Sequence, residues 1–197
     1  MATTSTTKMT VEEFLALPEE DGVYRELIRG ELVEYPRIPR TTRNAKHTLA
    51  VGRLAQHLWA WLDAQPSVEG VVATGEARCR LVTEEENAVG IDVGVFLSKA
   101  AADVAEEGGI YEENPIVAVE VLSPSDTHQK ISDRIHLYLE AKVPQIWIVD
   151  PEFKSVTVYR PSDPPVLLNR NQVLSGEPEL PGFQVAVAAL FQVKRSF

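Results

Sequence analysis

Residues 116–150, IVAVEVLSPSDTHQKISDRIHLYLEAKVPQIWIVD, decide the fold, because two apolar runs flank one helical pattern. The runs Ile116–Leu122 and Ile146–Val149 are typical of strands that are buried on both faces of a sheet. Between them, apolar residues recur at helical spacing: Ile131, Ile135, Tyr138 and Leu139. A strand, a helix and a strand in this order require a right-handed parallel crossover. The stretch therefore predicts an α/β (α+β) domain with a mixed central sheet.

The chain before this stretch supplies further elements. Thr10 and Glu13 form a capping box ahead of a short helix. Tyr24–Tyr35 alternates around Gly30 and predicts a β-hairpin. The stretch 41–65 has a helical pattern with an apolar face, which includes His47. Other strands are expected at 71–74, 77–82, 89–97 and 155–159, a short helix at 98–105, and a looser Pro-rich tail after residue 159.

Length and composition bound the class of protein. With 197 residues and 44% apolar content, the chain can bury the core of one domain, which we place at 10–197 behind a disordered tail at 1–9. The single cysteine, Cys79, excludes an internal disulfide and favours a reducing compartment. No apolar stretch is long enough for a membrane span. We therefore expect a soluble, cytoplasmic protein with no membrane partner.

The distribution of charge limits how the chain could contact nucleic acid. The formal net charge of −10 opposes a protein that coats phosphate backbones, since such affinity comes largely from Lys and Arg. A local basic patch would be needed, and one stretch offers it. A solvated helix side is the alternative interpretation of this stretch. The candidate nucleic-acid-binding residues are Arg37, Arg40, Arg43, Lys46 and Arg53.

Two acidic residues within expected strands indicate a chemical site. Glu120 interrupts an otherwise apolar strand, and Asp92 lies within VGIDVGVF (residues 89–96). Ionised groups are seldom buried without a partner or a metal. Two carboxylates on adjacent strands could converge on Mg²⁺, which prefers oxygen ligands. The alternatives are a buried salt bridge for Glu120 and an ordinary strand-end carboxylate for Asp92.

Cations follow Glu120 on the expected helix. Lys130 and Arg134 are four residues apart and so share one helix face, while Gln129 is rotated off that face. Such cations could offset negative charge that develops on a phosphate.

Several of these motifs together carry a family resemblance. YRELIRGELVE, the His47 helix, VGIDVGVFL, VAVEVLSPSD, DRIHLYLEAKVPQIWIVDP and LPGF resemble the Uma-type restriction endonucleases of the PD-(D/E)XK nuclease superfamily. The resemblance covers about residues 11–191 and implies a restriction-endonuclease-like core, with the sheet flanked by helices and preceded by a helix and a β-hairpin.

The resemblance also implies roles for single residues. Asp92 and Glu120 would be metal ligands for Mg²⁺ or Mn²⁺, Glu26 a further acidic ligand, and His47 would lie near the same cleft. The alternatives are a surface ion pair for Glu26 and a hydrogen-bonded core position for His47.

The chain departs from the family pattern at two places: the PD dipeptide is Ile91-Asp92, and Leu122 stands where the E-x-K motif has its lysine. The resemblance implies that the following helix supplies the missing lysine, and this chain has Arg134 at that position. An arginine cannot act as a general base, so Lys130 is the candidate if a base is needed.

These patterns together predict a metal-dependent endonuclease that acts on nucleic acid, with DNA as the expected substrate. A homodimer is expected, since cutting both strands of a duplex usually requires two sites. The alternative from another class is a catalytically silent nucleic-acid or protein-binding module on a nuclease scaffold.

Overall fold

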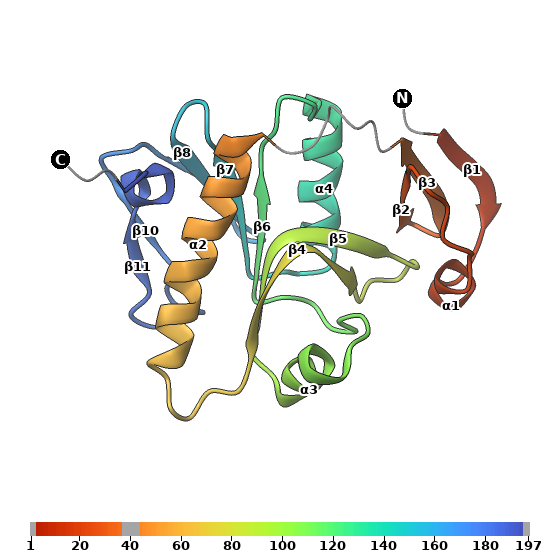
Figure 1. Cartoon of the computed structure of the whole chain (residues 1–197), viewed down its shortest axis with the longest axis horizontal. Helices are drawn as coiled ribbons and strands as arrows, with labels where there is room; N and C mark the ends of the chain where they lie inside the picture. Colours follow the sequence, from red (N-terminus) through yellow and green to blue (C-terminus); the bar gives the residue numbers. More distant parts are fainter. Residues whose placement is uncertain (1–2, 37–43, 195–197) are drawn as a thin grey trace.

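A large mixed sheet forms the centre of the molecule (Figure 1). The computed structural model describes residues 3–36 and 44–194. Within them the sheet has nine strands, in the order β1-β3-β2-β5-β6-β7-β8-β9, with β4 pairing β5 off this path. The strands are β1 (Thr3–Lys8), β2 (Val23–Ile28), β3 (Glu31–Pro36), β4 (Val71–Arg80), β5 (Ala88–Phe96), β6 (Val117–Val121), β7 (Gln145–Asp150), β8 (Ser155–Arg160) and β9 (Asp163–Leu168).

Helices cover both faces of the sheet (Figure 1). On one face, α2 (Ala45–Asp63) packs in a core cluster with the small sheet β10–β11 and with η1. On the other face, α4 (His128–Glu140) and α3 both contribute residues to a second core cluster. The remaining elements are α1 (Val11–Leu15), α3 (Lys99–Glu107), β10 (Val173–Ser175), β11 (Gln184–Ala186) and η1 (Val187–Phe191).

The predicted parallel crossover is confirmed. Strands β6 and β7 pair in parallel, with Glu120 opposite Ile148, and α4 connects them. Among the named strands of the described chain, this is the one parallel pair. The hairpin is also confirmed, because β2 and β3 pair around Arg29 and Gly30, both at positive φ. The predicted mixed sheet flanked by helices is therefore the observed architecture.

The sheet contains a gap that positions the site. Along one edge, β5 pairs with β4 over nearly its whole length. On its other edge, β5 pairs with β6 only at residues 93–95 and with β2 only at Ala88. Strands β6 and β2 therefore share one edge of β5, one at each end. Residues 89–92 of β5 lie between them, and their backbone polar groups need other partners.

Three details differ from the sequence expectations. Residues 3–8, within the expected disordered tail, form β1, which pairs antiparallel with β3. The two runs at 71–74 and 77–82 form the single strand β4, because Gly75 and Glu76 make a bulge at positive φ. The expected loose tail contains β9, which includes Pro164 and Pro165 and lies at the sheet edge, where proline is tolerated.

The structure also bears on the expectations for Cys79 and for membrane spans. Cys79 is buried, carries no disulfide, and donates to the backbone oxygen of Glu113 at 3.1 Å. No helix in the described part of the chain has the length and apolarity needed to cross a membrane.

Candidate functional site

Asp92 lies in the gap between β6 and β2. Its Oδ2 accepts hydrogen bonds from the Val121 backbone N–H of β6 at 2.9 Å and contacts His47 Nε2 at 3.1 Å. The Asp92 side chain is 4% exposed and that of His47 is 2% exposed. His47 occupies the first turn of α2, which begins at the N-cap Asn44, whose side chain accepts from the His47 backbone N–H. The start of α2 therefore fixes this carboxylate from one face of the sheet.

Glu120 reaches the same gap and bonds to the helix on the other face. The β5–β6 register ends at Val93 opposite Val119, and its continuation by one residue places Asp92 opposite Glu120. Glu120 Oε1 accepts a hydrogen bond from the Tyr138 hydroxyl of α4 at 2.5 Å. Burial, opposed by Arg134 and assisted by the charge of Asp92, raises the pKa of Glu120 to about 7. The two predicted carboxylates are therefore close enough to interact.

A guanidinium joins Glu120 to the N-terminal hairpin. Arg134 Nη2 donates to Glu26 Oε1 at 2.6 Å, and Arg134 Nε lies 3.4 Å from Glu120 Oε1. Glu26 is 1% exposed. Burial alone would raise the pKa of Glu26, but Arg134 outweighs burial and holds this pKa below its ordinary value. The structure thus brings Glu26 and Arg134 to the site, with Glu26 bonded to Arg134.

Glu26 also accepts a hydrogen bond from a backbone N–H of β5 that has no strand partner at the gap in the sheet. Its Oε1 accepts from the Gly90 backbone N–H of β5 at 3.2 Å and from the Tyr24 hydroxyl at 3.1 Å. Tyr24 and Gly90 are site residues that the sequence analysis missed. A signal for Tyr24 existed, because residues two apart on a strand point to the same face, as Tyr24 and Glu26 do. Gly90 carries no such signal, since it contributes a backbone group.

The donor atoms of this cluster fit a divalent cation such as Mg²⁺. Carboxylate oxygens are the ligands that Mg²⁺ prefers, and it is commonly held by one or two carboxylates with several waters. Burial and Asp92 both oppose ionisation of Glu120, an effect that a cation would reverse. Glu26 Oε2 is buried without a hydrogen-bond partner among the described residues. Across residues 3–36 and 44–194, no three His, Cys, Asp or Glu side chains form a ligand group, so a cation here would rely on two carboxylates and water.

The two other predicted residues of α4 are solvent-exposed. Lys130 Nζ lies 3.3 Å from Asp126 Oδ1 and 5.2 Å from the centre of the Tyr35 ring, at the start of the helix. Gln129 donates to Asp133 on the exposed side and joins no contact of the cluster. Lys130 is thus at the margin of the site, and Gln129 points elsewhere.

The predicted basic stretch is described only in part. Arg37, Arg40 and Arg43 lie outside the described residues. Lys46 is exposed on α2 and forms an ion pair with Glu152 at 2.7 Å. Arg53 donates to the backbone oxygen of Gln192.

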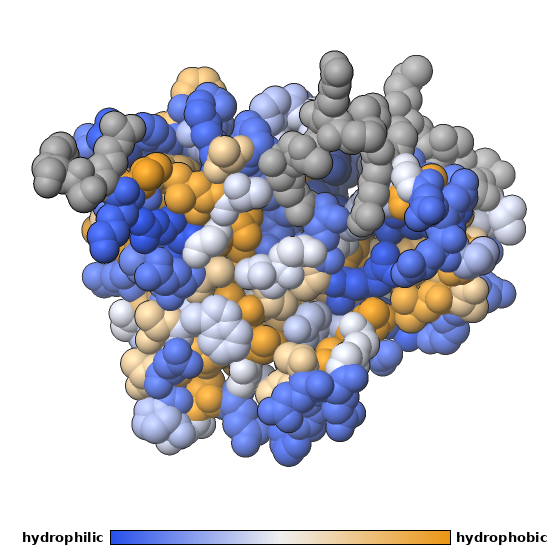
Figure 2. Space-filling view, in the orientation of Figure 1, coloured by the Kyte–Doolittle hydropathy of each residue, from blue (hydrophilic) through white to orange (hydrophobic). Residues whose placement is uncertain are grey.

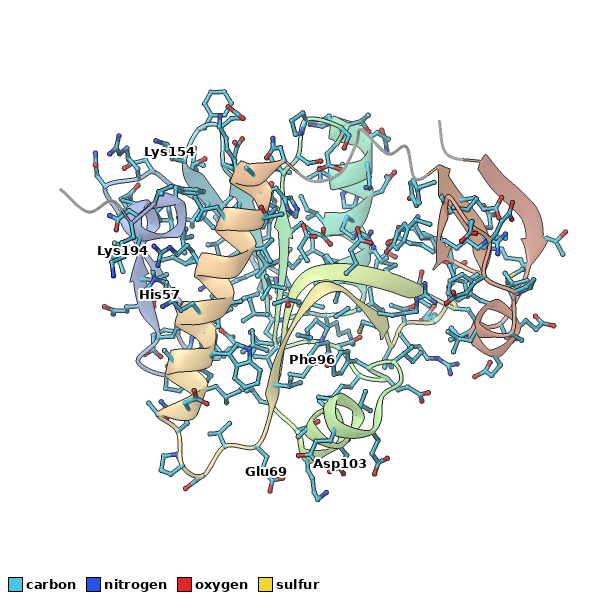
Figure 3. All side chains as sticks on the ribbon, in the orientation of Figure 1. His57, Glu69, Phe96, Asp103, Lys154 and Lys194 are labelled. Carbon is cyan, nitrogen blue, oxygen red and sulfur yellow. The ribbon has the colours of Figure 1, made fainter. Side chains whose placement is uncertain are left out.

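A separate hollow of about 460 Å³ lies at the opposite end of α2 from His47. Trp59 and Asp63 of α2 line it together with Lys99 and Asp103 of α3. Glu69 and Asp103 mark this region in Figure 3. The hollow is therefore distinct from the carboxylate cluster.

Gly90 offers a test of how tightly the cluster is packed. A Cβ at Gly90 would lie 2.2 Å from the Tyr24 hydroxyl, so Gly90→Ala must displace the group that bonds Glu26. We expect this substitution to destabilise the protein by about 1–3 kcal/mol in urea unfolding. Gly52→Ala is the matched control, because nothing lies within 4 Å of its Cβ on α2. It should be stabilising by roughly 0.5–1 kcal/mol. Equal effects of the two variants would contradict the tight packing.

Comparisons with known proteins agree with this architecture. A crystal structure from Anabaena variabilis ATCC 29413, titled as a "putative nuclease belonging to DUF820", is similar to this chain with a TM-score of 0.71 and 22% identity. The similarity covers 93% of this chain and 97% of that one, and it establishes the shared fold. No curated protein sequence matches the chain. A family model described as "Uma2: Putative restriction endonuclease" matches residues 11–188. Because this match spans most of the sequence, the chain belongs to the Uma2 restriction endonuclease family.

Proposed function

We propose that this protein is a metal-dependent endonuclease that hydrolyses phosphodiester bonds, with DNA as its substrate. Family membership supports a nuclease activity in general. The observation that carries the proposal is the meeting of Asp92, Glu120 and Arg134 at one gap in the sheet, where two carboxylates interact and a guanidinium lies beside them.

Asp92 and Glu120 would hold a Mg²⁺ or Mn²⁺ ion. When bound, such an ion supplies Lewis-acid activation of water and offsets negative charge on the phosphate. The chain's own contribution is to keep both carboxylates in place. His47 and the Val121 N–H fix Asp92, and the Tyr138 hydroxyl fixes Glu120. Such supporting bonds orient ligands and restrict them to one geometry.

Arg134 is the residue that would stabilise charge on the phosphate. Its Nη1 is buried and has no hydrogen-bond partner among the described residues, so its N–H groups would donate to a phosphate oxygen that enters the site. Its other contacts, to Glu26 and Glu120, hold the guanidinium plane in position. Glu26 therefore acts as a positioning residue for Arg134. Lys130, at the exposed start of α4, can contact a phosphate that approaches the site.

One observation favours the alternative, a catalytically silent nucleic-acid or protein-binding module. Arg134 Nε already lies 3.4 Å from Glu120 Oε1, so the guanidinium takes up space beside this carboxylate that a metal ion would need. A second observation is that the E-x-K motif lacks its lysine. Leu122 takes that position and packs against the core on the α4 face. Binding without metal uptake would be the signature of this alternative.

Cleavage assays test the proposed function directly. Supercoiled plasmid and single-stranded DNA are incubated with the protein in Mg²⁺, in Mn²⁺ and in EDTA. Cleavage that requires the metal is the expected result. Light scattering of the same preparation tests the homodimer, which would bring two sites to the two strands of a duplex. Intact DNA under all metal conditions would reject the proposal in favour of the binding module.

A further inference from the structure

We propose that Phe153, at the tip of the turn between β7 and β8, is a stacking platform for an unpaired nucleotide base. This inference rests on the proposed nuclease function, and it extends that function to substrates with single-stranded or strand-separated segments. It is drawn from the exposure of Phe153, the rigidity of its turn, its position beside the carboxylate cluster and the charges around it.

The Phe153 side chain is in an unusual environment. It is 82% exposed, more than any other large hydrophobic residue in the described part of the chain. Aromatic side chains normally bury most of their area, and one that projects into solvent offers a large apolar face to a ligand. In Figure 2 the same turn is a small apolar projection above hydrophilic surface, at the upper edge of the molecule.

The turn that carries Phe153 is held rigidly. Asp150 Oδ1 accepts from the backbone N–H groups of Glu152 at 2.8 Å and of Phe153 at 3.0 Å. The strands are paired up to the base of the turn, with Asp150 opposite Ser155. Lys154 completes the turn at a φ of 53°. A fixed backbone presents the ring without the entropy loss that a mobile loop would incur on binding.

The turn lies at the same end of the sheet as the carboxylates. Strand β7 runs parallel to β6, and Glu120 is only one residue from the end of β6, so the turn after β7 extends beyond the site. Glu152 in this turn pairs with Lys46 at 2.7 Å, and the next residue, His47, contacts Asp92. Figure 1 shows the turn beside the start of α2, and the label of Lys154 in Figure 3 marks the same region.

Two cations near Phe153 are placed to contact a phosphate backbone. Lys154 follows Phe153 directly, and Lys46 of α2 is next to the turn. The β8–β9 pairing brings Leu168 opposite Val156, so the segment that contains Arg170 emerges at this end of the sheet. The pair of Glu152 with Lys46 carries no net charge and Asp150 caps the backbone, so Lys154 and Arg170 are the cations left for contacts with phosphate.

An exposed aromatic ring followed by a lysine matches the chemistry of single-stranded nucleic acid. Successive bases stack on aromatic side chains while cations contact the backbone, and stacking tolerates any sequence because every base has a π-face. Bases within an intact duplex are already stacked on their neighbours. The structure therefore favours an unpaired base as the occupant.

The test measures binding of the full-length protein in EDTA, which prevents cleavage. Fluorescence anisotropy is recorded with a single-stranded oligonucleotide and with its duplex, for the wild type, Phe153→Ala, Phe153→Trp and Lys154→Ala. Val82→Ala is the matched control, since Val82 is 60% exposed in the loop between β4 and β5. Thermal unfolding verifies that each variant is folded. A 2-aminopurine base in the oligonucleotide reports stacking by fluorescence quenching.

We expect Phe153→Ala to weaken single-strand binding by about 5–100-fold and to remove the quenching, while duplex binding stays within about twofold. Phe153→Trp should retain both, and Val82→Ala should match the wild type. Lys154→Ala should lower the slope of log affinity against log salt by about one, and Phe153→Ala should leave that slope unchanged.

Other outcomes separate the inference from the proposed function. Equal single-strand binding by Phe153→Ala and wild type overturns the stacking role and leaves the nuclease proposal intact. A wild type that binds no nucleic acid in EDTA also overturns the stacking role, and the cleavage assay in Mg²⁺ and Mn²⁺ then decides the nuclease proposal separately. A change of oligomeric state in Phe153→Ala, without a change in nucleic-acid binding, assigns the ring to a protein interface and also overturns the inference.

Discussion

Replacing Asp92 by Asn, or Glu120 by Gln, should reduce phosphodiester cleavage by a factor of about 10² to 10³ or more. Each substitution keeps the size of the side chain and removes the charge that would hold the metal ion. The proposed chemistry needs both carboxylates at the gap between β6 and β2, so the two variants should be similarly impaired. Initial rates of plasmid nicking in Mg²⁺ provide the measurement.

Asp133→Asn is the control for this comparison. Asp133 lies on α4, next to Arg134 in sequence, but it is exposed and bonds Gln129. This variant should cleave at the wild-type rate. If the Asp92 and Glu120 variants also matched the wild type, the assignment of the site would be rejected.

The second large effect concerns stability. Arg134→Met should lower the free energy of unfolding by about 3–5 kcal/mol, because it leaves Glu26 and Glu120 in a largely buried site without their guanidinium. Adding Glu26→Gln to Arg134→Met should recover part of this loss, since one unpaired buried charge is then removed. Urea unfolding of the single and double variants gives the coupling energy between the two residues.

Lys99→Met is the control for the ion pair. Lys99 pairs with Asp103 on the surface of α3, where solvent screens the pair, so this variant should unfold at nearly the same urea concentration as the wild type. The Glu26 contribution should also depend on pH. The pKa of Glu26 in the folded protein is below the ordinary value of 4.5, so its contribution is complete above that pH and is lost as acidification protonates the group. If the effects of Arg134→Met and Glu26→Gln on the free energy of unfolding were additive at neutral pH, the coupling between the two residues would be contradicted.

The parts of the fold that follow local patterns could be predicted from the sequence. The apolar runs around Glu120 and Ile146 predict buried strands, and β6 and β7 are buried along almost their whole length. The helical spacing between them predicts α4 and hence the parallel pairing. Strand β1 could not be predicted, because the polar stretch TTSTTK has no apolar alternation and forms a strand only by pairing with β3. In β9, Pro164 and Pro165 argue against a strand unless its edge position is known.

The candidate site was predictable only where a charge interrupts an apolar run. Glu120 and Asp92 stand out for that reason, and the structure places both in one gap. The bond between Arg134 and Glu26 joins residues 108 positions apart, and no local pattern identifies it. Lys130 and Arg134 share a helix face as predicted, yet Lys130 is exposed and Arg134 is buried, because only the later turns of α4 pack on the sheet. How deeply a residue of a helix is buried depends on the tertiary fold, which the local sequence pattern does not contain.

Titration calorimetry with Mn²⁺ tests the central claim most directly, because it asks whether Asp92 and Glu120 together bind a divalent cation. The wild type should show one saturable site per chain, and this site should disappear in both Asp92→Asn and Glu120→Gln while Asp133→Asn retains it. Mn²⁺ binding that is absent from the wild type, or that is unchanged when either carboxylate is removed, would contradict the account.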